Sequence, residues 1–525
     1  MQIRRYEPKW RDDFIRLNRN WIEHYFTLEP SDLHTLSAVE ETILKPGGEI
    51  FFALDESEQP VGCVALIRHE AEGKWELAKM AVDPASQGKG YGRRLGLSLM
   101  NYARAIGVER LYLEANTALK ASVALYEQLG FTPVAGARGH YDRCNLYMEA
   151  DLTSFPPQTY RPDNDPRLRT ALLLSGGVDS ALALHLLCEQ GVRPDVFYIK
   201  IGLEGEDLGC TAEEDIELSI VTACRYGLRL EVIDLQQAYA DRVLTYVANC
   251  ARRGFTPNPD VMCNRLIKFG AFEEQRGFAY DRIATGHYAR MVRNATDQTL
   301  WMKTSPDPVK DQTDFLARLN RHQLSKLICP IGHLQKDEVR RLALEAKLPS
   351  ARRRDSQGIC FLGKTNYNDL LTRLLGRQKG PVIEEATGRV VGEHEGHWFH
   401  TIGQRKGLGL GGGPWFVTRK DPVANIVYVA HGYAPEAAYC RSFVLSDGRY
   451  LTADPFGGAT EADILFKIRH TETPHRGRLT RLDATSWRID ADEAVQGVAP
   501  GQFGVVYTPD GQICAGCGEI AERLV

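Results

Sequence analysis

Residues 170–187 constrain the fold of this chain more than any other stretch. They read TALLLSGGVDSALALHLL, in which one apolar run ends at Ser175-Gly176-Gly177 and a second apolar series begins at Ala181. The first run predicts a strand, and the spacing of the second predicts a packed helix. Paired glycines let the backbone approach an anion closely, and a helix N-terminus offers unpaired N–H groups. The stretch therefore predicts a phosphate-binding turn between a strand and a helix.

This turn lacks the Gly-Lys-Ser/Thr ending of the Walker loop. Residues 175–180, Ser-Gly-Gly-Val-Asp-Ser, resemble instead the PP-loop of ATP pyrophosphatases, which cleave ATP to AMP and pyrophosphate. On the hexapeptide alone, an ordinary strand–helix turn with glycines for tightness stays open. The resemblance implies that ATP, with its bound magnesium and no other metal, is held by Leu173, Leu174, Ser175, Gly176, Gly177, Val178, Asp179, Ser180, Ile199 and Gly286.

Length and composition indicate how many domains the chain has, where the protein is located and how it could bind nucleic acid. A chain of 525 residues predicts three or four domains at about 150 residues each. We expect a cytoplasmic protein without a membrane partner, because the chain has no apolar run of bilayer length and starts without the apolar core of a signal peptide. The net charge of −4 means that a nucleic-acid partner would have to use local basic patches.

Residues 1–152 contain a second glycine-rich turn. Predicted strands at 50–54, 61–68 and 77–82 lead to Gln87-Gly88-Lys89-Gly90-Tyr91-Gly92 and a helix, and a later Asn116…Tyr126…Gly130-Phe131 series follows. This arrangement resembles the GNAT acetyltransferases. The resemblance implies an acetyl-CoA site formed by Met80, Ala81, Val82, Gln87, Gly88, Lys89, Gly90, Tyr91, Gly92, Asn116 and Tyr126, with Tyr126 as a general acid.

The acetyl acceptor cannot be identified from the sequence. Glu76 and Glu114 are candidate bases, although single carboxylates on strands are more often surface residues. A GNAT fold that lost its activity and became a docking module is the alternative to an acetyltransferase.

Residues 169–375, after a linker at 153–168, alternate predicted strands and helices, which favours a doubly wound parallel sheet. Three further stretches lie on loops or at strand ends: residues 254–264, residues 285–290, and residues 310–312 with 355–361. Together with the phosphate loop, in this order, they resemble the tRNA-uridine 2-sulfurtransferases, the bacterial MnmA family and its mitochondrial relatives. The resemblance continues to the C-terminus, with a small central domain at 376–436 and a β-barrel at 437–525.

The chemistry of that family explains two of the cysteines. Replacing a uracil oxygen by sulfur requires the oxygen to become a leaving group, which adenylation by ATP achieves. Sulfur then arrives on a cysteine persulfide, and a second thiol releases it. By resemblance, Cys360 carries the persulfide, Cys263 is the paired nucleophile and Asp260 is the acid/base, so a persulfide donor is an implied partner.

The second implied partner is tRNA, whose wobble uridine would be the substrate. The resemblance assigns tRNA contacts to Asn258, Pro259, Asp260, His287, Lys310, Asp311, Gln312, Arg469, His470 and Gln502. The basic run 352–354 could add contacts to tRNA phosphates or to an acidic sulfur donor. An adenylating ligase, which would need the phosphate loop without the cysteine pair, and a tRNA-binding scaffold with decayed sites are the alternatives.

The remaining cysteines are expected to be structural. Cys188, Cys224 and Cys250 lie in helical patterns and are predicted core residues. Cys514 and Cys517 form a lone C-x-x-C, which we interpret as a hairpin turn with incidental thiols, because no matching pair stands nearby to complete a zinc site. The predicted architecture is thus multidomain, α/β plus β.

Overall fold

The structure is a computed structural model of the chain. It describes residues 1–136, 139–153, 168–202, 211–294, 296–355, 367–433 and 436–524. The chain divides into two compact units, which we describe separately: unit 1 comprises Met1–Arg161 with Phe272–Asp281, and unit 2 comprises Pro162–Ala271 with Arg282–Val525. The segment Phe272–Asp281, predicted within the phosphate-loop domain, thus clusters with unit 1. None of the helices in the described part of the chain is long and apolar enough to span a membrane.

Unit 1 is built on a seven-stranded sheet in the order β1-β2-β3-β4-β5-β7-β6. The strands are β1 Gln2–Arg5, β2 Glu49–Leu54, β3 Pro60–His69, β4 Lys74–Val82, β5 Arg110–Ala115, β6 Thr132–Pro133 and β7 Leu146–Asp151. The helical elements are η1 Pro8–Trp10, α1 Arg11–Tyr25, α2 Pro30–Ser37, η2 Glu40–Leu44, η3 Pro84–Ser86, α3 Tyr91–Ala105, α4 Lys120–Gln128, α10 Phe272–Gln275 and η6 Gly277–Ala279.

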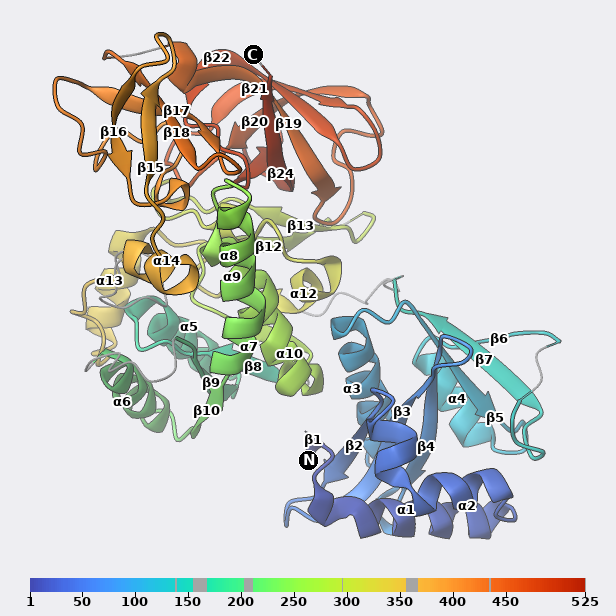
Figure 1. Ribbon diagram of the computed structural model, residues 1–525. Helices are drawn as coiled ribbons and strands as arrows, with labels where there is room; N and C mark the ends of the chain where they lie inside the picture. The colour runs from blue at the N-terminus through green and yellow to red at the C-terminus, as the bar shows by residue number, and fades with distance from the viewer. Residues whose placement is uncertain are drawn as a thin grey trace. The chain divides into compact units, whose positions relative to one another are not determined.

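Helices cover both faces of this sheet, because alternate side chains of each strand point to opposite sides. Ile50 and Phe52 of β2 pack with Phe14 of α1, whereas Phe51 packs against Tyr102 of α3. The blue part of Figure 1 shows α1 and α2 on one side of the sheet and α3 on the other. The three strands predicted at 50–54, 61–68 and 77–82 correspond to β2, β3 and β4.

The N-terminal part of unit 2 contains a five-stranded parallel sheet in the order β10-β9-β8-β11-β14. Its strands are β8 Thr170–Leu173, β9 Asp195–Lys200, β10 Leu230–Asp234, β11 Arg282–Ala284 and β14 Leu327–Ile328. The order reverses at β8, so the turn after β8 lies at the topological switch point, where open parallel sheets bind ligands. The doubly wound sheet predicted from the sequence is confirmed.

Helices and a small ribbon complete this region. They are α5 Val178–Glu189, α6 Thr211–Cys224, α7 Gln236–Tyr239, η4 Ala240–Leu244, α8 Thr245–Arg252, α9 Pro259–Cys263, η5 Asn264–Ala271, β12 Arg290–Arg293, β13 Leu300–Lys303, α11 Thr313–Leu316, α12 Arg321–Lys326, α13 Lys336–Glu345 and α14 Tyr367–Leu375. Helices α5 and α13 share a core with β8 and β9 through Leu172, Val196 and Leu184.

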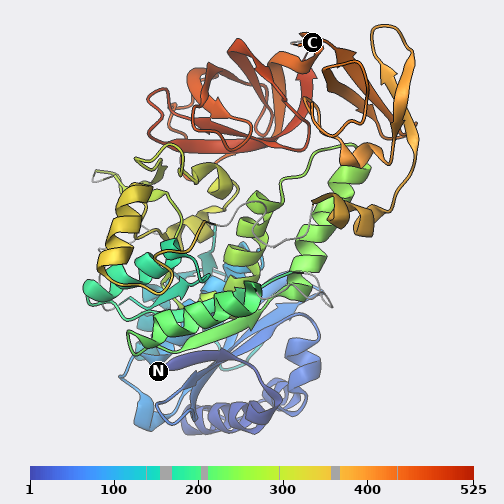
Figure 2. The same cartoon turned by 90° about the vertical axis from the view of Figure 1, so that its left-hand side faces the viewer.

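Two β-structures follow, seen in orange and red in Figures 1 and 2. A four-stranded sheet, order β16-β15-β18-β17, consists of β15 Gly380–Glu384, β16 Val390–His394, β17 Trp415–Asp421 and β18 Ile426–His431, with the helical turn η7 His397–Phe399. After η8 Glu436–Ala438, a closed six-stranded barrel is formed by β19 Tyr439–Tyr450, β20 Glu461–Lys467, β21 His475–Arg481, β22 Trp487–Gln496, β23 Phe503–Tyr507 and β24 Cys514–Leu524. The predicted C-terminal barrel is therefore confirmed.

Candidate functional site

The predicted phosphate loop of unit 2 joins β8 to α5. Gly176 has φ +73°, a left-handed conformation, and a Cβ there would lie 2.8 Å from the Cα of Asp215. The loop also folds onto itself, since the Ser180 hydroxyl accepts a hydrogen bond from the Ser175 N–H at 3.1 Å. Only glycine fits position 176, because both the backbone conformation and the space exclude a side chain.

Gly286 brings a second predicted segment against this loop. It follows β11, and a Cβ at this position would lie 2.6 Å from the backbone nitrogen of Ser180. The predicted ATP residues Ser180 and Gly286 are therefore neighbours. Leu174 and Ile199 lie on the adjoining strand ends, where the Leu174 N–H donates to the Phe197 carbonyl at 2.8 Å and Ile199 pairs with Ile233.

Two residues that were not predicted hold the acidic residue of the loop. Lys336 Nζ lies 2.7 and 2.9 Å from the two carboxylate oxygens of Asp179, and the Tyr288 hydroxyl donates to Asp179 Oδ1 at 2.7 Å. Burial, followed by the neighbouring Asp179 carboxylate, raises the pKa of Tyr288. Sequence reasoning missed Lys336 because a single lysine at a helix start carries no signal by itself.

A second carboxylate, Asp355, extends the same cluster. Lys310 Nζ approaches Asp355 Oδ2 at 2.7 Å, and Lys336 Nζ approaches Asp355 Oδ1 at 2.9 Å. Burial acts to raise the pKa of Asp355, but hydrogen bonds from Lys310 and Lys336 outweigh it and lower the pKa to about 2. The predicted tRNA residue Lys310 thus reaches the phosphate loop through Asp355 and Lys336.

The middle arginine of the basic run 352–354 also contacts the loop. Arg353 Nη1 donates to the Gly176 carbonyl at 3.1 Å, and Arg353 forms an ion pair with Asp215. These are contacts within the protein, whereas the sequence suggested contacts to tRNA or to a sulfur donor for this run. The positive charge of Arg353 therefore lies beside the phosphate loop.

Cys263 ends a short helix that a barrel residue holds in place. Asn258 caps α9, its side chain accepting from the Val261 N–H at 3.2 Å, and Cys263 is 2% exposed. Gln502 of the barrel donates to the Thr256 and Pro257 carbonyls at 3.1 and 2.9 Å, and Asn258 donates to Gln502 Oε1 at 3.4 Å. Asn258, Pro259, Asp260, Cys263 and Gln502, all predicted, therefore share one region.

A pocket adjoins this region. Its lining comes from α9, from residues 314–315 and from the barrel, and comprises Asn258, Val261, Asp314, Phe315, Lys467, Arg469, His470, Phe503 and Val505. His470 Nδ1 lies 3.0 Å from Asp314 Oδ2, and its ring stands 4.8 Å from that of Phe315. The hydrogen bond to Asp314 raises the pKa of His470. Three predicted tRNA residues, Asn258, Arg469 and His470, thus line one pocket with an aromatic ring.

The remaining predicted tRNA residues bond within the protein. Asp311 is 2% exposed, and its carboxylate lies 3.3 Å from Lys467 Nζ. The side-chain oxygen of Gln312, Oε1, accepts a hydrogen bond from the Tyr288 N–H at 3.1 Å. Burial lowers the pKa of His287 to about 3, so this imidazole is neutral at pH 7. Lys467, which the sequence suggested as part of a basic surface, is also buried, at 4% exposed.

The other cysteine predictions fare differently. Cys360 lies outside the described residues. The hairpin interpretation of Cys514 and Cys517 is wrong, because both lie on strand β24, are buried, and point their thiols at the Thr313 and Ala317 carbonyls. Cys224 was predicted as core but is exposed. Within the described ranges, no group of three or more metal-ligating side chains occurs.

Unit 1 contains the second predicted site. Strands β4 and β5 pair only through Glu76 and Tyr112, so they separate beyond that point and leave the backbone of residues 80–82 without a partner strand on that side. Lys79, with φ +52°, coincides with a shift in the β3–β4 register. Gly88 and Gly90, with φ +75° and +84°, then lead into α3 at Tyr91. The unpaired backbone of residues 80–82 is thus followed by the glycine turn, which leads to the N-terminus of α3.

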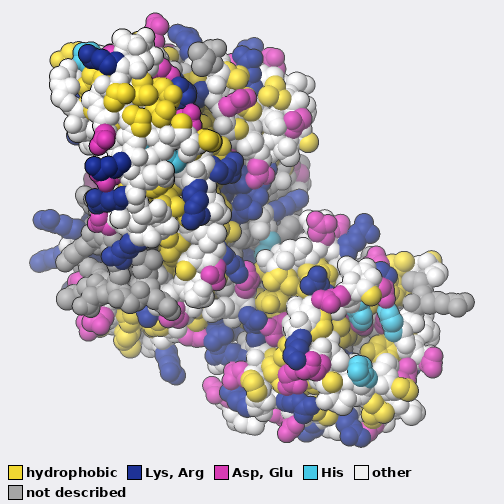
Figure 3. Space-filling model, in the orientation of Figure 1, with side chains coloured by type: hydrophobic (Ala, Val, Ile, Leu, Met, Phe, Trp, Pro, Cys, Tyr) yellow, Lys and Arg dark blue, Asp and Glu magenta, His cyan; other side chains and the backbone are white. Residues whose placement is uncertain are grey.

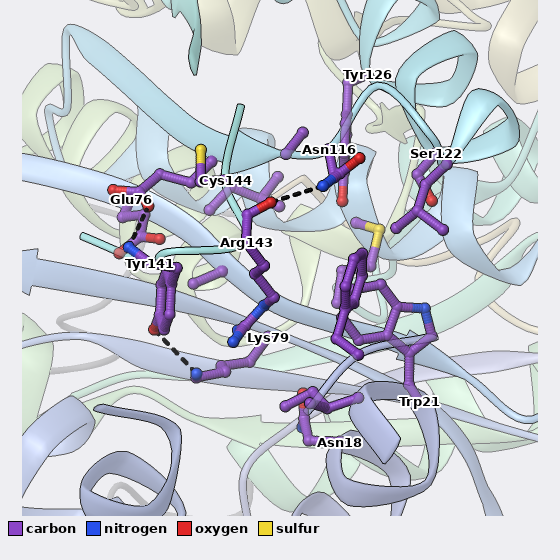
Figure 4. A pocket seen from close by; sticks show the side chains of 18 residues that line it. Asn18, Trp21, Glu76, Lys79, Asn116, Ser122, Tyr126, Tyr141, Arg143 and Cys144 are labelled. Carbon is purple, nitrogen blue, oxygen red and sulfur yellow. Dashed lines mark hydrogen bonds between the residues drawn. The ribbon is translucent and has the colours of Figure 1, made fainter. Parts of the chain in front are cut away.

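A pocket lies at the separation of β4 and β5 (Figure 4). The lining includes the predicted Met80, Asn116 and Tyr126, and burial raises the pKa of Tyr126 to about 12. It also includes Glu76 and Glu114, whose side chains are 5% and 2% exposed, which corrects the expectation that such carboxylates lie on the surface.

Two cations in this pocket share one buried carboxylate, and Arg143 also pairs with Glu29 at 2.9 Å. Lys79 Nζ and Arg143 Nη1 each lie 2.6 Å from an oxygen of Asp32, which is 0% exposed. Tyr141 accepts from Lys79 at 2.9 Å (Figure 4). No sequence pattern indicated this network, because Asp32 and Arg143 are 111 residues apart.

Family models match the chain in four segments. Residues 14–131 match the acetyltransferase (GNAT) family, 168–364 a tRNA methyl transferase HUP domain, 368–431 a tRNA methyl transferase PRC-barrel domain, and 441–520 an aminomethyltransferase β-barrel domain. Two solved structures match 29% of this chain. One is a GNAT-family acetyltransferase of Staphylococcus aureus, matched over 98% of its length at 19% identity and a TM-score of 0.27. The other is an acetyltransferase of Streptococcus agalactiae, matched over 97% of its length at 25% identity and a TM-score of 0.26.

Curated relatives match the part that follows the GNAT domain. The chain is 57% identical to tRNA-specific 2-thiouridylase MnmA 2 of Bacteroides fragilis, 55% to MnmA 1 of Bacteroides thetaiotaomicron and 51% to MnmA of Parabacteroides distasonis. These matches cover 67%, 67% and 68% of this chain and 99% of each relative. The chain therefore belongs to the MnmA family of tRNA-specific 2-thiouridylases, which makes it a transferase, and carries an additional GNAT-family domain at its N-terminus.

Proposed function

We propose that unit 2 replaces the C2 oxygen of a tRNA wobble uridine by sulfur at the expense of ATP. The observation that carries this proposal is the short segment 310–315, which joins the two predicted binding regions. Lys310 at its start bonds to Asp355 of the cluster at the phosphate loop, and Asp314 bonds to His470 in the pocket beside α9. A uridine in that pocket would therefore stand near a nucleotide on the loop.

ATP would supply the adenylyl group that turns the uracil oxygen into a leaving group. Its phosphates suit the loop, because the loop leads into the N-terminus of helix α5 and Lys336 and Arg353 lie beside it. The set proposed to hold ATP with magnesium is Leu173, Leu174, Ser175–Ser180, Ile199 and Gly286, and we add Lys336 to it. An adenylating ligase would need the same loop, but neither a cysteine at position 263 nor the pocket residues supplied by the barrel.

The sulfur transfer uses two cysteines. The persulfide sulfur on Cys360 attacks C2 of the adenylated uracil, the C2–O bond breaks, and AMP leaves with the oxygen. The Cys263 thiolate then attacks the Cys360 sulfur, the S–S bond of the persulfide breaks, and a Cys263–Cys360 disulfide remains. Asp260, partly exposed beside the pocket, is proposed to exchange protons with the base. A persulfide donor and a reductant that reopens the disulfide are needed in each cycle.

Contacts with tRNA are proposed for two groups of residues. Asn258, Pro259, Arg469, His470 and Gln502 lie in or beside the pocket, where a flipped base would be read. The second group is His287, Lys310, Asp311 and Gln312, which bond to other residues of the protein and would hold those segments in place as well as contact tRNA.

Nucleoside mass spectrometry tests the thiolation. Cells that lack the gene should lose 2-thiouridine derivatives, and the wild-type gene should restore them. Genes with Cys360→Ser or Cys263→Ser should not restore them, whereas Cys224→Ser, at an exposed cysteine, serves as the matched control and should. Unchanged 2-thiouridine in the deletion strain, with no second copy of the enzyme, would contradict the proposal.

We further propose that unit 1 transfers an acetyl group from acetyl-CoA. The separation of β4 and β5 beside a glycine turn supports this, because pantetheine could pair with the backbone of Met80–Val82 while the pyrophosphate meets residues 87–92. Asn116 and Tyr126 complete the proposed site, and the Tyr126 hydroxyl would protonate the leaving thiolate. Calorimetry with acetyl-CoA distinguishes this from a docking module, which would show no heat of binding.

A further inference from the structure

Three arginines of unit 2 come together where the barrel meets the helices before it. Arg265 lies in η5, Arg318 between α11 and α12, and Arg449 in β19. Arg449 donates to the Arg318 carbonyl, and Arg318 Nη1 donates to the Asp447 carbonyl at 3.0 Å. The charges of all three arginines act on the Asp447 carboxylate. We call Arg265, Arg318 and Arg449 the arginine cluster.

The described carboxylates do not balance the charge of this cluster. Asp447 forms an ion pair with Arg318. Glu519 also faces Arg318, but Arg253 acts on Glu519 more strongly. Four guanidinium groups therefore face two carboxylates. Burial raises the pKa of the Cys517 thiol beside Arg318, so this thiol is neutral at pH 7 and offsets no charge.

Much of the cluster also lacks a hydrogen-bond partner within the described part of the chain. The Arg265 side chain forms no hydrogen bond or ion pair there. The buried Nε atoms of Arg318 and Arg449 have no partner there either. Burial, followed by repulsion from Arg318 and Arg265, lowers the pKa of Arg449 to about 10. Buried positive charge without a partner is unfavourable, so the cluster suits an anion that comes from outside the protein.

The position of the cluster favours an RNA phosphate as this anion. Arg318 stands over the Phe503 ring, with its Cζ 5.2 Å from the ring centroid, and Phe503 lines the pocket proposed to read the uridine. A base in that pocket stays attached to its backbone, which brings phosphates close to the walls of the pocket. The planar guanidinium matches the oxygens of a phosphate. Figure 3 shows further lysine and arginine side chains on the visible face of unit 2 beneath the barrel, where they favour a polyanion.

We propose that the arginine cluster binds one backbone phosphate of the tRNA next to the flipped uridine. The outer amino groups of Arg265 and Arg449 would bond to the phosphate oxygens, and Arg318, held by Asp447, would add charge behind them. The three arginines touch none of the reacting atoms and are therefore positioning residues. This inference rests on the proposed thiolation, and it adds a contact that the assigned tRNA residues do not include.

The salt dependence of tRNA binding tests this inference. The affinity of the full-length protein for a transcribed tRNA with a wobble uridine is measured by fluorescence anisotropy at several salt concentrations. Each phosphate contact contributes about 0.7–0.9 to the slope of log K against log[salt]. The double variant Arg265→Gln/Arg449→Gln should bind tRNA roughly tenfold more weakly and lower this slope by about 0.7–0.9, with part of the loss in each single variant.

Arg488→Gln is the matched control, because this barrel arginine already pairs with Asp490 at 2.8 Å, and its slope should equal that of wild type. The unfolding temperature of Arg265→Gln without tRNA should stay the same or rise, because the variant loses no bond and relieves repulsion. Its affinity for ATP, measured by calorimetry, should not change.

Three results would each overturn this inference and leave the thiolation standing. A lower unfolding temperature of Arg265→Gln would show a structural role, and weaker ATP binding would assign the cluster to a nucleotide phosphate. A wild-type slope in the double variant would assign it to another anion, such as an acidic protein partner. Failure of the wild-type protein to bind tRNA would overturn both proposals.

Discussion

The two glycine turns of this protein look alike in sequence and differ in how the fold holds them. In unit 2, Gly176 and Gly286 are enclosed: added Cβ atoms would lie 2.8 and 2.6 Å from backbone atoms of Asp215 and Ser180. In unit 1, Gly88 and Gly90 face open space among the described residues. The first turn is shaped by the chain packed around it. The second is shaped by its own positive φ angles.

The difference extends to charge. Lys336 and Arg353 stand against the enclosed turn from distant parts of the chain, whereas the open turn carries its exposed Lys89 within its own sequence. The enclosed turn should therefore respond to substitutions far from it, and the open turn should respond to local ones. The four predictions that follow test this contrast, beginning with the largest expected effect.

Gly286→Ala should be the most damaging single change. Its methyl group would collide with the Ser180 backbone, which can move only if the start of α5 moves. Overpacking of this kind costs about 1–3 kcal/mol, so ATP affinity should fall about ten- to a hundredfold. Calorimetric titration with ATP measures the effect. Gly411→Ala, where an added Cβ meets open space in the described structure, is the matched control; wild-type affinity in Gly286→Ala would refute the enclosed arrangement.

Lys336→Met tests whether charge reaches the loop from a distance. The lysine side chain is 12% exposed and bonds to both Asp179 and Asp355, so its removal leaves two carboxylates without that partner. Leaving such groups short of a partner costs about 1–3 kcal/mol, and we expect ATP to bind about tenfold more weakly. Lys336→Arg should recover most of the affinity. Arg341→Met, on the exposed side of the same helix, should have no effect.

Asp355 should make unit 2 less stable as the pH falls into the acid range. Its pKa is about 2, below the value of about 3.9 expected in the unfolded chain, so its contribution is present above pH 4 and is lost as pH falls through 2. Asp355→Asn should lower the unfolding temperature at pH 7 and remove part of its decline between pH 4 and pH 2. Thermal unfolding followed at several pH values measures this. A parallel downward shift at every pH would show that the carboxylate charge does not contribute.

Sequence patterns predicted the parts of the molecule that are local. Both glycine turns, the strands β2, β3 and β4, the parallel sheet and the barrel each depend on short runs of residue types. Lys336 and the contact of Tyr288 with Asp179 were missed, because their importance comes from contacts between segments whose spacing repeats no motif. The C-x-x-C pair was assigned to a turn because the spacing of two cysteines does not tell a turn from a strand. In the structure both cysteines lie on strand β24, where their thiols are buried.

The smallest effect should come from Gly88→Ala, the counterpart of Gly286→Ala in the open turn. The added methyl group meets open space in the described structure, so only the left-handed backbone, φ +75°, opposes it. That strain costs about 1 kcal/mol, which should lower the unfolding temperature of unit 1 by a few degrees and weaken acetyl-CoA binding less than tenfold. Gly88→Asn, a residue that tolerates positive φ, should recover most of the loss. A loss as large as that of Gly286→Ala on ATP would mean that this turn too is held by its surroundings, and the contrast between the two turns would fail.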